Sequence, residues 1–353
     1  MRIASVGSAL PQHFYDQETI LSRLEGAWAE RHFNLERLRQ LHHNVLVGGR
    51  HLALPIDDYQ GLTTFGQSNA AWLRVGLEVG AAALLAALER AGLERERIAA
   101  LYFVSVTGLS VPSLDARLMN RMGLPVSTKR VPIFGLGCVA GAAGIARCAD
   151  YVRAFPDEVA VLLSVELCSL TLQRGDLSIP NLVASGLFGD GAAAVAVAGA
   201  AVGPTGDAWG PEVVATRSAF YPDTEHVMGW DISESGFKVV LSADVPDMVV
   251  QHLRRDVDAF LAEQGLSLGD VASFVCHPGG PKVLEAMERA LELPPDALEL
   301  TWRSLREVGN LSSTSVLLVL ERTMSERRPP SGSFGLLLAM GPGFCSELVL
   351  LRW

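Results

Sequence analysis

Two distant segments of the sequence repeat the same helix–glycine–strand pattern. Leu88–Leu93 is followed by four residues and the apolar run Ile98–Val104, and Leu261–Leu266 is followed by four residues and Val271–His277. In both segments a glycine ends a helical pattern, as left-handed C-caps do, and a buried strand follows. The spacing is identical without a gap, which predicts a duplicated chain. The alternative is chance, because this unit is common in α/β proteins.

A second pair of segments supports the duplication. Phe188–Gly191 precedes the apolar run Ala192–Val197 much as Met340–Gly343 precedes Leu348–Leu351. Between the pairs lies the Gly- and Pro-rich segment Gly199–Pro211, which has no periodic hydrophobicity and is the best candidate for a boundary. We therefore expect two similar halves, residues 1–205 and 206–353, with equivalent strand ends facing each other.

Short β-branched runs alternate with Ala-rich helical stretches along the chain. Ala100–Val106 and Val159–Val165 are predicted strands, and Trp72–Ala91 and Val245–Ala262 are predicted helices. Strands that alternate with helices indicate an α/β fold with buried sheets. Two further segments have no regular character: Gln60–Ser68 and Gly175–Ala184.

Composition excludes several classes of protein. Hydrophobic residues make up 49% of the chain and charged residues 19%, and the net charge is -10, which disfavours both disorder and nucleic-acid binding. The longest apolar run, Val79–Leu88, is about half a membrane span, and the N-terminus has no secretory signal, so we expect a cytoplasmic protein without a transmembrane helix. The odd number of cysteines also indicates a reducing compartment: Cys138, Cys148, Cys168, Cys276 and Cys345.

Cys138 lies between a predicted strand, Val131–Phe134, and a helix that extends to about Ala154. At a helix start the unpaired amides and the helix dipole favour a thiolate, so this residue is a candidate nucleophile. A buried core cysteine is an equally simple interpretation. A dinucleotide-binding loop is a third, but Gly141 comes one position too late for that motif.

Two other residues complete a possible catalytic set. His277 ends a buried run before Pro278 and two glycines, so its side chain should emerge at a strand terminus. Asn310 precedes a predicted helix and is either a helix cap or a donor to an oxyanion. We expect His42 and His43, on a helix with charged neighbours, at the surface. The sequence contains no metal-ligand spacing, so a zinc site is not predicted.

With these residues the chain resembles a type III polyketide synthase of the chalcone and stilbene synthase superfamily. The resemblance rests on five motifs in the family's order: Gly137-Cys138, Leu187-Phe-Gly-Asp-Gly-Ala-Ala193, His277-Pro-Gly-Gly-Pro281, Gly309-Asn-Leu-Ser-Ser313 and Gly341-Pro-Gly343. It covers the chain from Cys138 to the end and weakens before about residue 60. It implies a thiolase-like α/β fold with two duplicated αβαβα halves in a five-layered structure.

The resemblance also implies a mechanism and partners. Cys138 carries the acyl chain as a thioester, and His277 and Asn310 stabilise the enolate that forms when malonyl-CoA loses CO2. His277 also pairs with the Cys138 thiolate in the resting state. Acyl-CoA and malonyl-CoA are the substrates, no organic cofactor or metal is needed, and the family forms homodimers. The starter is delivered either on CoA or on an acyl carrier protein.

The resemblance assigns further residues to substrate binding. Phe188 is a gatekeeper between the CoA tunnel and the cavity, and Val239 stands where the second, usually aromatic, gatekeeper is expected. Val111 reaches the partner's cavity, and Arg37 is a candidate for the CoA phosphates because Gln40 and Asn44 replace the family's cations. The expected cavity wall also includes Thr107, Cys168, Thr171, Trp230, Gly341, Pro342 and Gly343.

The predicted function is iterative decarboxylative condensation of malonyl-CoA onto an acyl-CoA starter, followed by cyclisation to an alkylpyrone or alkylresorcinol. The segment Met228–Leu241 resembles bacterial members with such products. An aromatic or malonyl starter is the alternative within the family. Outside it, a thiol hydrolase or simple acyltransferase would not need Asn310, and a non-catalytic partner subunit would not need Cys138.

Overall fold

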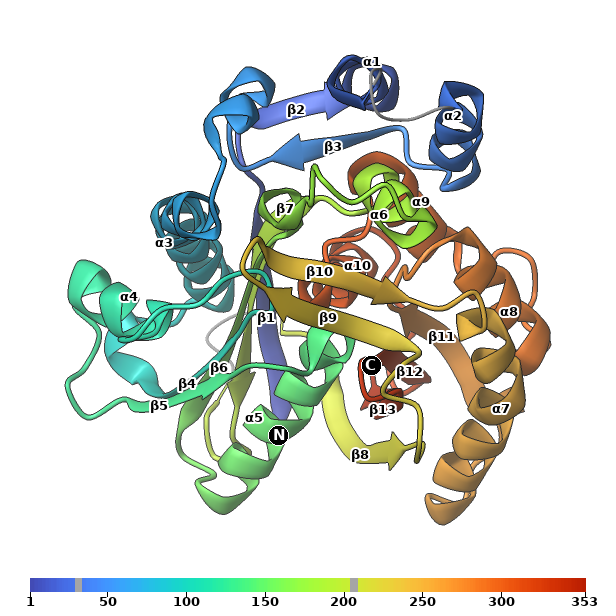
Figure 1. The fold of residues 1–353 in the computed structure, drawn as a ribbon. Coiled ribbons are helices and arrows are strands. Elements are labelled where there is room, and N and C mark those ends of the chain that lie inside the picture. The colour runs from blue at the N-terminus through green and yellow to red at the C-terminus, as the bar shows by residue number, and fades with distance from the viewer. Residues whose placement is uncertain (29–33, 204–208) are drawn as a thin grey trace.

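The computed structural model describes residues 1–28, 34–203 and 209–353. Within these residues nine strands form one sheet in the order β11-β12-β13-β8-β1-β7-β6-β4-β5 (Figure 1). The strands are β1 (Arg2–Ala9), β4 (Ile98–Val104), β5 (Lys129–Ile133), β6 (Val159–Leu167), β7 (Asp190–Ala198), β8 (Glu212–Phe220), β11 (Val271–Cys276), β12 (Phe334–Gly341) and β13 (Cys345–Arg352).

The strand directions repeat across the junction of β1 with β8. The pair β4–β6 is parallel and the pairs β6–β7 and β7–β1 are antiparallel. In the same way β11–β12 is parallel, and β12–β13 and β13–β8 are antiparallel. The two halves meet where Arg2 of β1 faces Glu212 of β8. The predicted internal repeat is therefore present in the topology. The division at residue 205 stays a prediction, because that residue lies outside the described ranges.

Helices form three layers around the two half-sheets (Figure 1). α5 (Ala140–Ala154) and α10 (Ser313–Glu326) lie between the halves, and α3 (Phe65–Ala91) covers the outer face of the first half. α7 (Val245–Glu263) and α8 (Pro281–Leu291) cover the second half. The result is the thiolase-like five-layered arrangement.

The two central helices approach closely because α5 is rich in Ala and Gly. A Cβ placed on Gly141 would lie 2.3 Å from the carbonyl oxygen of Ser313 at the start of α10. Only glycine fits this contact. The helix that carries Cys138 at its start is thereby held against the helix that follows Asn310.

The helix α3 is long and apolar enough to span a membrane, with a mean hydropathy of 1.6 over its most apolar window, 61% of which is buried. Its buried residues pack on β1, β6 and β7. The apolar composition of α3 is therefore accounted for by its place in the core.

The remaining elements lie outside the nine-stranded sheet. The segment Gly175–Ala184, expected to be irregular, in fact enters α6 (Ile179–Leu187), whose Pro180 is suited to a first helical turn. Similarly, α3 begins at Phe65, within the segment Gln60–Ser68 that was also expected to be irregular. The other elements are β2 (His13–Asp16), β3 (Gly49–Leu52), β9 (Met228–Ser233), β10 (Gly236–Leu241), α1 (Gln17–Trp28), α2 (Leu35–Asn44), α4 (Leu114–Met122) and α9 (Glu299–Val308).

Candidate active site

A cavity of about 590 Å³ collects most of the residues that the sequence singled out. Cys138, His277 and Asn310 all line it, although they come from three separate parts of the chain. Five of the expected substrate-binding residues also line this cavity: Cys168, Phe188, Trp230, Val239 and Pro342. We call this space the reaction cavity.

Cys138 sits in a tight turn that directly precedes α5. Gly137 has φ +54°, a left-handed conformation that favours glycine, and a Cβ there would lie 2.6 Å from Cγ of Pro342. Gly341 lies against the backbone of Leu136 and Val139. The terminal Gly-Pro-Gly motif therefore braces the turn that presents the thiol. Pro342 lines the reaction cavity, whereas Gly341 and Gly343 do not.

The thiol of Cys138 is buried and donates to Oγ of Ser312 over 3.8 Å. Burial raises the pKa of Cys138 to about 12, although hydrogen bonds from the Ser312 and Asn310 side chains oppose this shift. Burial therefore favours the neutral thiol of Cys138 over the expected thiolate. Loss of solvation outweighs the effect of the helix start.

His277 follows β11 directly, as predicted, and only 3% of its surface is exposed. Both ring nitrogens are buried without a hydrogen-bond partner, so the expected pairing with Cys138 is not present. Burial lowers the pKa of His277 to about 3, which keeps the imidazole neutral with a single N–H. A buried donor without a partner at a cavity wall is available to a substrate oxygen.

Asn310 is fixed by its own side-chain hydrogen bonds. Its Oδ1 accepts from the Ser312 amide at 2.8 Å, and its Nδ2 donates to the Gly279 carbonyl over 3.2 Å. An amide nitrogen carries two N–H groups, and the one that is not bonded to Gly279 can donate to the Cys138 sulfur or, in its place, to a substrate oxygen. Ser312 itself has φ +50°, an unfavourable conformation for serine. Ser312 lies within the motif Gly309–Ser313, but the sequence alone did not indicate a role for it.

Glu166 is a second residue that the sequence analysis missed. Its buried carboxyl on β6 accepts from the Thr107 hydroxyl at 3.0 Å, from the Val106 amide at 3.1 Å and from the Ser313 hydroxyl. Burial raises the pKa of Glu166 to about 7. Its charge also contributes to the raised pKa of Cys138. A lone Glu inside an apolar strand was the available signal.

Thr107 is not a wall residue, contrary to expectation. Its hydroxyl donates to Glu166 and accepts from the Leu167 amide at 2.9 Å, and the side chain lines neither of the two cavities described here. Two hydrogen-bond partners behind the wall hold the hydroxyl away from the open space. Val111 also lines neither cavity, and it is fully exposed.

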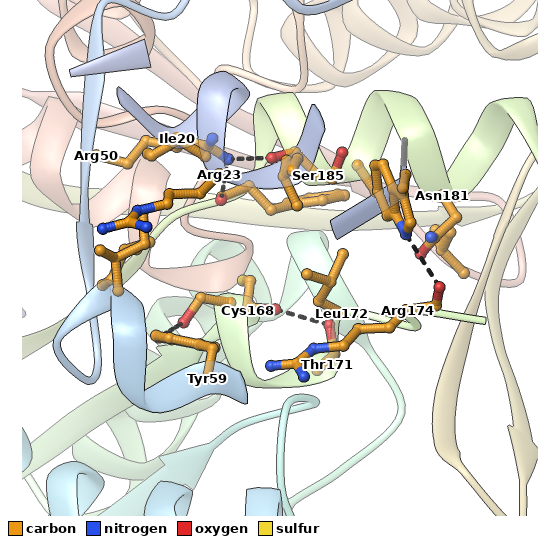
Figure 2. Close-up of a pocket in the computed structure, with 18 of the residues that line it drawn as sticks. Ile20, Arg23, Arg50, Tyr59, Cys168, Thr171, Leu172, Arg174, Asn181 and Ser185 are labelled. Atoms are coloured by element: carbon orange, nitrogen blue, oxygen red, sulfur yellow. Dashed lines mark hydrogen bonds between the residues drawn. The ribbon is translucent and has the colours of Figure 1, made fainter. Parts of the chain in front are cut away.

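A second, smaller and mostly apolar cavity of about 140 Å³ (Figure 2) shares lining residues with the reaction cavity. Thr171 lines only this smaller cavity. Four residues line both spaces and form the wall between them: Cys168, Phe188, Trp230 and Val239. Arg50 of β3 fixes one end of this wall, because its Nη1 donates to the carbonyls of Ser185 and Phe188 at 2.8 and 2.9 Å.

The mouth of the reaction cavity carries positive charge. Arg37 and Asn44 of α2 line it together with Lys282 at the start of α8. Lys282 directly follows the His277 motif but was not recognised in the sequence. Gln40 does not line the cavity. The nearby His42 is buried, not exposed as expected, with Nε2 3.1 Å from the Ser185 hydroxyl.

Within the described residues no group of three or more His, Cys, Asp and Glu side chains could hold a metal ion. The reactive groups that line the cavity include the thiol of Cys138, the imidazole of His277 and the amide of Asn310.

Family models identify the group of proteins to which this arrangement belongs. The N-terminal domain of chalcone and stilbene synthases matches residues 2–201, and the C-terminal domain matches residues 212–353. The chain belongs to the chalcone and stilbene synthase family. These enzymes are type III polyketide synthases, so this protein is an acyltransferase that builds polyketides, as the resemblance of its motifs implied.

Individual relatives cover almost the whole chain. The 1,3,6,8-tetrahydroxynaphthalene synthase of Streptomyces peucetius subsp. caesius is 55% identical over 99% of this chain and 93% of its own length. The phloroglucinol synthase of Pseudomonas fluorescens is 33% identical over 97% of this chain and 96% of its own. The crystal structure of 1,3,6,8-tetrahydroxynaphthalene synthase from Streptomyces coelicolor superposes with a TM-score of 0.93 at 32% identity, covering 100% of this chain and 99% of that one.

Proposed function

We propose that this polyketide synthase is primed and extended by malonyl-CoA alone and that it forms 1,3,6,8-tetrahydroxynaphthalene. The observation that carries this is the 55% identity to a relative with that product. The products of these relatives contain the numbers of carbon atoms that malonyl units alone would supply. A naphthalene has ten carbons, each malonyl unit supplies two after decarboxylation, and five units leave no carbon for a different starter. Phloroglucinol, a bare benzene triol, is likewise three such units.

The wall of the reaction cavity supports the small starter. The smaller apolar cavity would give a long acyl chain on Cys138 additional space, but Trp230 lies in the wall that separates it from the reaction cavity. Priming by a fatty acyl-CoA to give an alkylpyrone or alkylresorcinol, which the sequence suggested, would require this wall to open. The structure therefore favours the malonyl alternative over the alkyl products.

Loading and extension follow from the three reactive groups. The neutral imidazole of His277 takes the thiol proton as Cys138 attacks the malonyl thioester, and CoA leaves with that proton. A second malonyl-CoA then loses CO2. The negative charge of the resulting enolate oxygen is stabilised by N–H groups of His277 and Asn310, each worth about 3–4 kcal/mol in the transition state.

Carbon–carbon bond formation closes each cycle. The enolate carbon attacks the thioester carbonyl on Cys138, and the sulfur departs as a thiolate, because the thiol proton left with CoA during loading and His277 is neutral. The chain, two carbons longer, is now on CoA and can be transferred back to Cys138. Burial of the site excludes water, which would otherwise hydrolyse the thioester or quench the enolate.

Substrate delivery on CoA fits the charges at the mouth. Arg37 and Lys282 line the entrance, and the positive N-terminal end of α8 lies beside Lys282. Delivery on an acyl carrier protein is the alternative. It predicts that carrier-bound malonyl primes the enzyme faster than malonyl-CoA.

A product assay tests the proposal. The enzyme is incubated with malonyl-CoA alone, and separately with malonyl-CoA and a series of fatty acyl-CoAs, and products are identified by mass spectrometry. We expect tetrahydroxynaphthalene from malonyl-CoA alone. Alkylpyrones or alkylresorcinols that form only when a fatty acyl-CoA is added would overturn malonyl priming and restore the first expectation from the sequence.

A further inference from the structure

Two residues of the wall between the cavities, Trp230 and Val239, lie on the hairpin of β9 and β10, which is separate from the nine-stranded sheet. Strands β9 and β10 pair only with each other within the described residues, and Trp230 lies directly opposite Val239 across them. These two side chains line both cavities. The position of the wall therefore depends on what holds the hairpin to the rest of the molecule.

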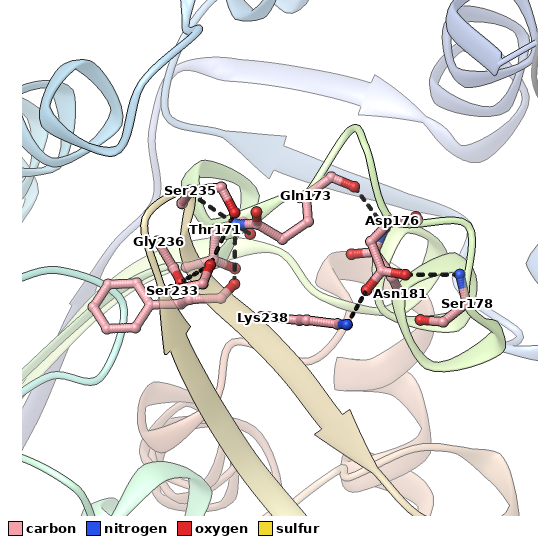
Figure 3. Close-up of polar contacts among 10 residues, drawn as sticks. Thr171, Gln173, Asp176, Ser178, Asn181, Ser233, Ser235, Gly236 and Lys238 are labelled. Carbon is pink, nitrogen blue, oxygen red and sulfur yellow. Dashed lines mark hydrogen bonds and ion pairs between the residues drawn. The ribbon is translucent and has the colours of Figure 1, made fainter.

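Gln173 makes this connection through one side-chain amide (Figure 3). Its Nε2 lies 3.2 Å from the Ser235 carbonyl at the tip of the hairpin and 3.1 Å from the Phe237 carbonyl at the start of β10. It also lies 3.1 Å from the Thr171 carbonyl, in the turn that carries Cys168. A single buried group thus ties the two sides of the cavity wall together.

The backbone of Gln173 is itself fixed. Its carbonyl accepts at 2.9 Å from Nδ2 of Asn181 in α6, and the same Nδ2 donates to the Asp176 carbonyl over 2.7 Å (Figure 3). Asn181 is 3% exposed. The hydrogen bonds therefore run from the buried part of α6 to the hairpin without passing through solvent, where such bonds contribute little.

Other contacts hold the hairpin less specifically. The rings of Phe237 and Phe65 pack with centroids 5.3 Å apart, but apolar packing fixes no register between surfaces. Lys238 and Asp176 form an ion pair of 3.8 Å in which 49% of the lysine side chain is exposed, and exposed pairs of this kind contribute little. The directional contacts of the hairpin to the turn at Cys168 are those of Gln173.

We propose that Gln173 is a positioning residue for starter selection. By holding the hairpin against the turn Cys168–Thr171, it keeps the side chains of Trp230 and Val239 closed between the two cavities, so that long acyl chains cannot enter the smaller one. This deepens the proposed function, because it identifies the contact that makes the small malonyl starter the preferred one. Gln173 touches neither cavity and is not a catalytic residue.

The test compares Gln173→Met with Lys238→Met. Methionine keeps the length of the side chain but has no N–H to donate, whereas the second change removes only the exposed ion pair of the same hairpin. We measure kcat/KM for priming by malonyl-CoA and by octanoyl-CoA, and hydrogen exchange of residues 228–241. In Gln173→Met the ratio of octanoyl to malonyl priming should rise about five- to tenfold, the size expected for losing about one buried hydrogen bond. Exchange in the hairpin should accelerate. Lys238→Met should match the wild type.

The role of Gln173 and malonyl priming can be refuted separately. A folded Gln173→Met with an unchanged priming ratio, or with unchanged exchange in the hairpin, would overturn it. If that variant does not fold, Gln173→Asn, which is one carbon shorter, replaces it and should shift the ratio in the same direction; no shift there would equally refute the inference. If the wild type makes an alkyl product, malonyl priming is wrong, but the shift relative to the wild type still decides the role of Gln173.

Discussion

At Cys138 two physical effects on the thiol pKa oppose each other. The turn before α5 favours a thiolate. Burial of the thiol and the charge of Glu166 oppose this effect and raise the pKa of Cys138 to about 12. Burial also lowers the pKa of His277 to about 3, so both shifts favour a neutral thiol beside a neutral imidazole at rest. We expect proton transfer from the thiol only once a thioester is bound. This suits an enzyme whose nucleophile has to be protected between cycles.

Alkylation by iodoacetamide reports this resting state. Only the thiolate reacts, so the rate of inactivation should continue to rise from about pH 8 to about pH 10 and should show no plateau near neutrality. Cys138→Ser provides the baseline for reaction at other cysteines. A rate that levels off below about pH 8 would show instead that the thiolate is present at rest.

Glu166 makes stability depend on pH. Its pKa is about 7 when folded and 4.5 in its ordinary state, so the folded protein holds the proton over a range where the unfolded chain has lost it. The stabilisation is fully present below about pH 4.5 and is lost as the pH rises through about 7, by about 3 kcal/mol for the whole shift.

Denaturant unfolding of the wild type and of Glu166→Gln should show this difference. The wild type should lose stability relative to the variant between about pH 4.5 and pH 7, and the difference should level off above that. The buried Asp190, which also has a raised pKa, is common to both proteins and cancels. Parallel pH curves for the two proteins would mean that Glu166 is ionised throughout.

Among the elements, the hairpin of β9 and β10 determines the space available to the growing chain. Trp230 is partly exposed and lines both cavities, and its ring lies 6.0 Å from that of Phe237. These contacts agree with a wall residue and not with a core residue behind the cavity.

Replacement of Trp230 by glycine should join the two cavities. We expect priming by fatty acyl-CoA to increase and the free energy of unfolding to fall by about 1–3 kcal/mol, less than for a fully buried ring. Ile232→Ala, at an exposed position of the same strand, is the control. Product profiles across acyl lengths are read beside the melting temperature. An unstable variant with an unchanged product profile would place Trp230 in the core.

The sequence predicted the helices, strands and turns that can be recognised from the residues within the element itself. Strand β6 is buried along its whole length, helix α7 buries one face at helical spacing, and glycines mark the turn at Cys138, so all three could be predicted from local sequence. The start of α6 was missed because its first turn contains Ser178 and Pro180, which also occur in loops. Glu166 and the buried His42 could not be placed, since their partners, Ser313 and Ser185, lie more than a hundred residues away in the chain. The adjacency of the two cavities likewise depends on long-range packing.

For the molecule as a whole, the exposed apolar residues indicate a second copy of the chain. Val111 and Val126 are fully exposed, and Phe134 and Leu109 are 48% and 39% exposed. Val111 lines neither of the two cavities described above, which leaves it free to reach that of a partner, as the family resemblance implied.

Light scattering at micromolar concentration should give twice the chain mass of 37.8 kDa. Val111→Asp should weaken the dimer, because burial of a charge in an apolar interface is costly. The control is an aspartate at a polar surface position, Ser325, which should leave the mass unchanged. A wild-type mass equal to one chain would contradict the dimer.

The central claim is that Asn310 and His277 stabilise an enolate while Cys138 carries the chain. It is tested most directly with malonyl-CoA labelled in its free carboxyl group, by following labelled CO2 and the mass of the Cys138 adduct in the wild type, Asn310→Ala and Asn310→Asp. The aspartate keeps an acceptor for the Ser312 amide, whose bond to Oδ1 measures 2.8 Å, but has no N–H to donate. Both variants should release CO2 at least about 100-fold more slowly while Cys138 is still acylated. Undiminished CO2 release together with loss of the adduct would contradict the account.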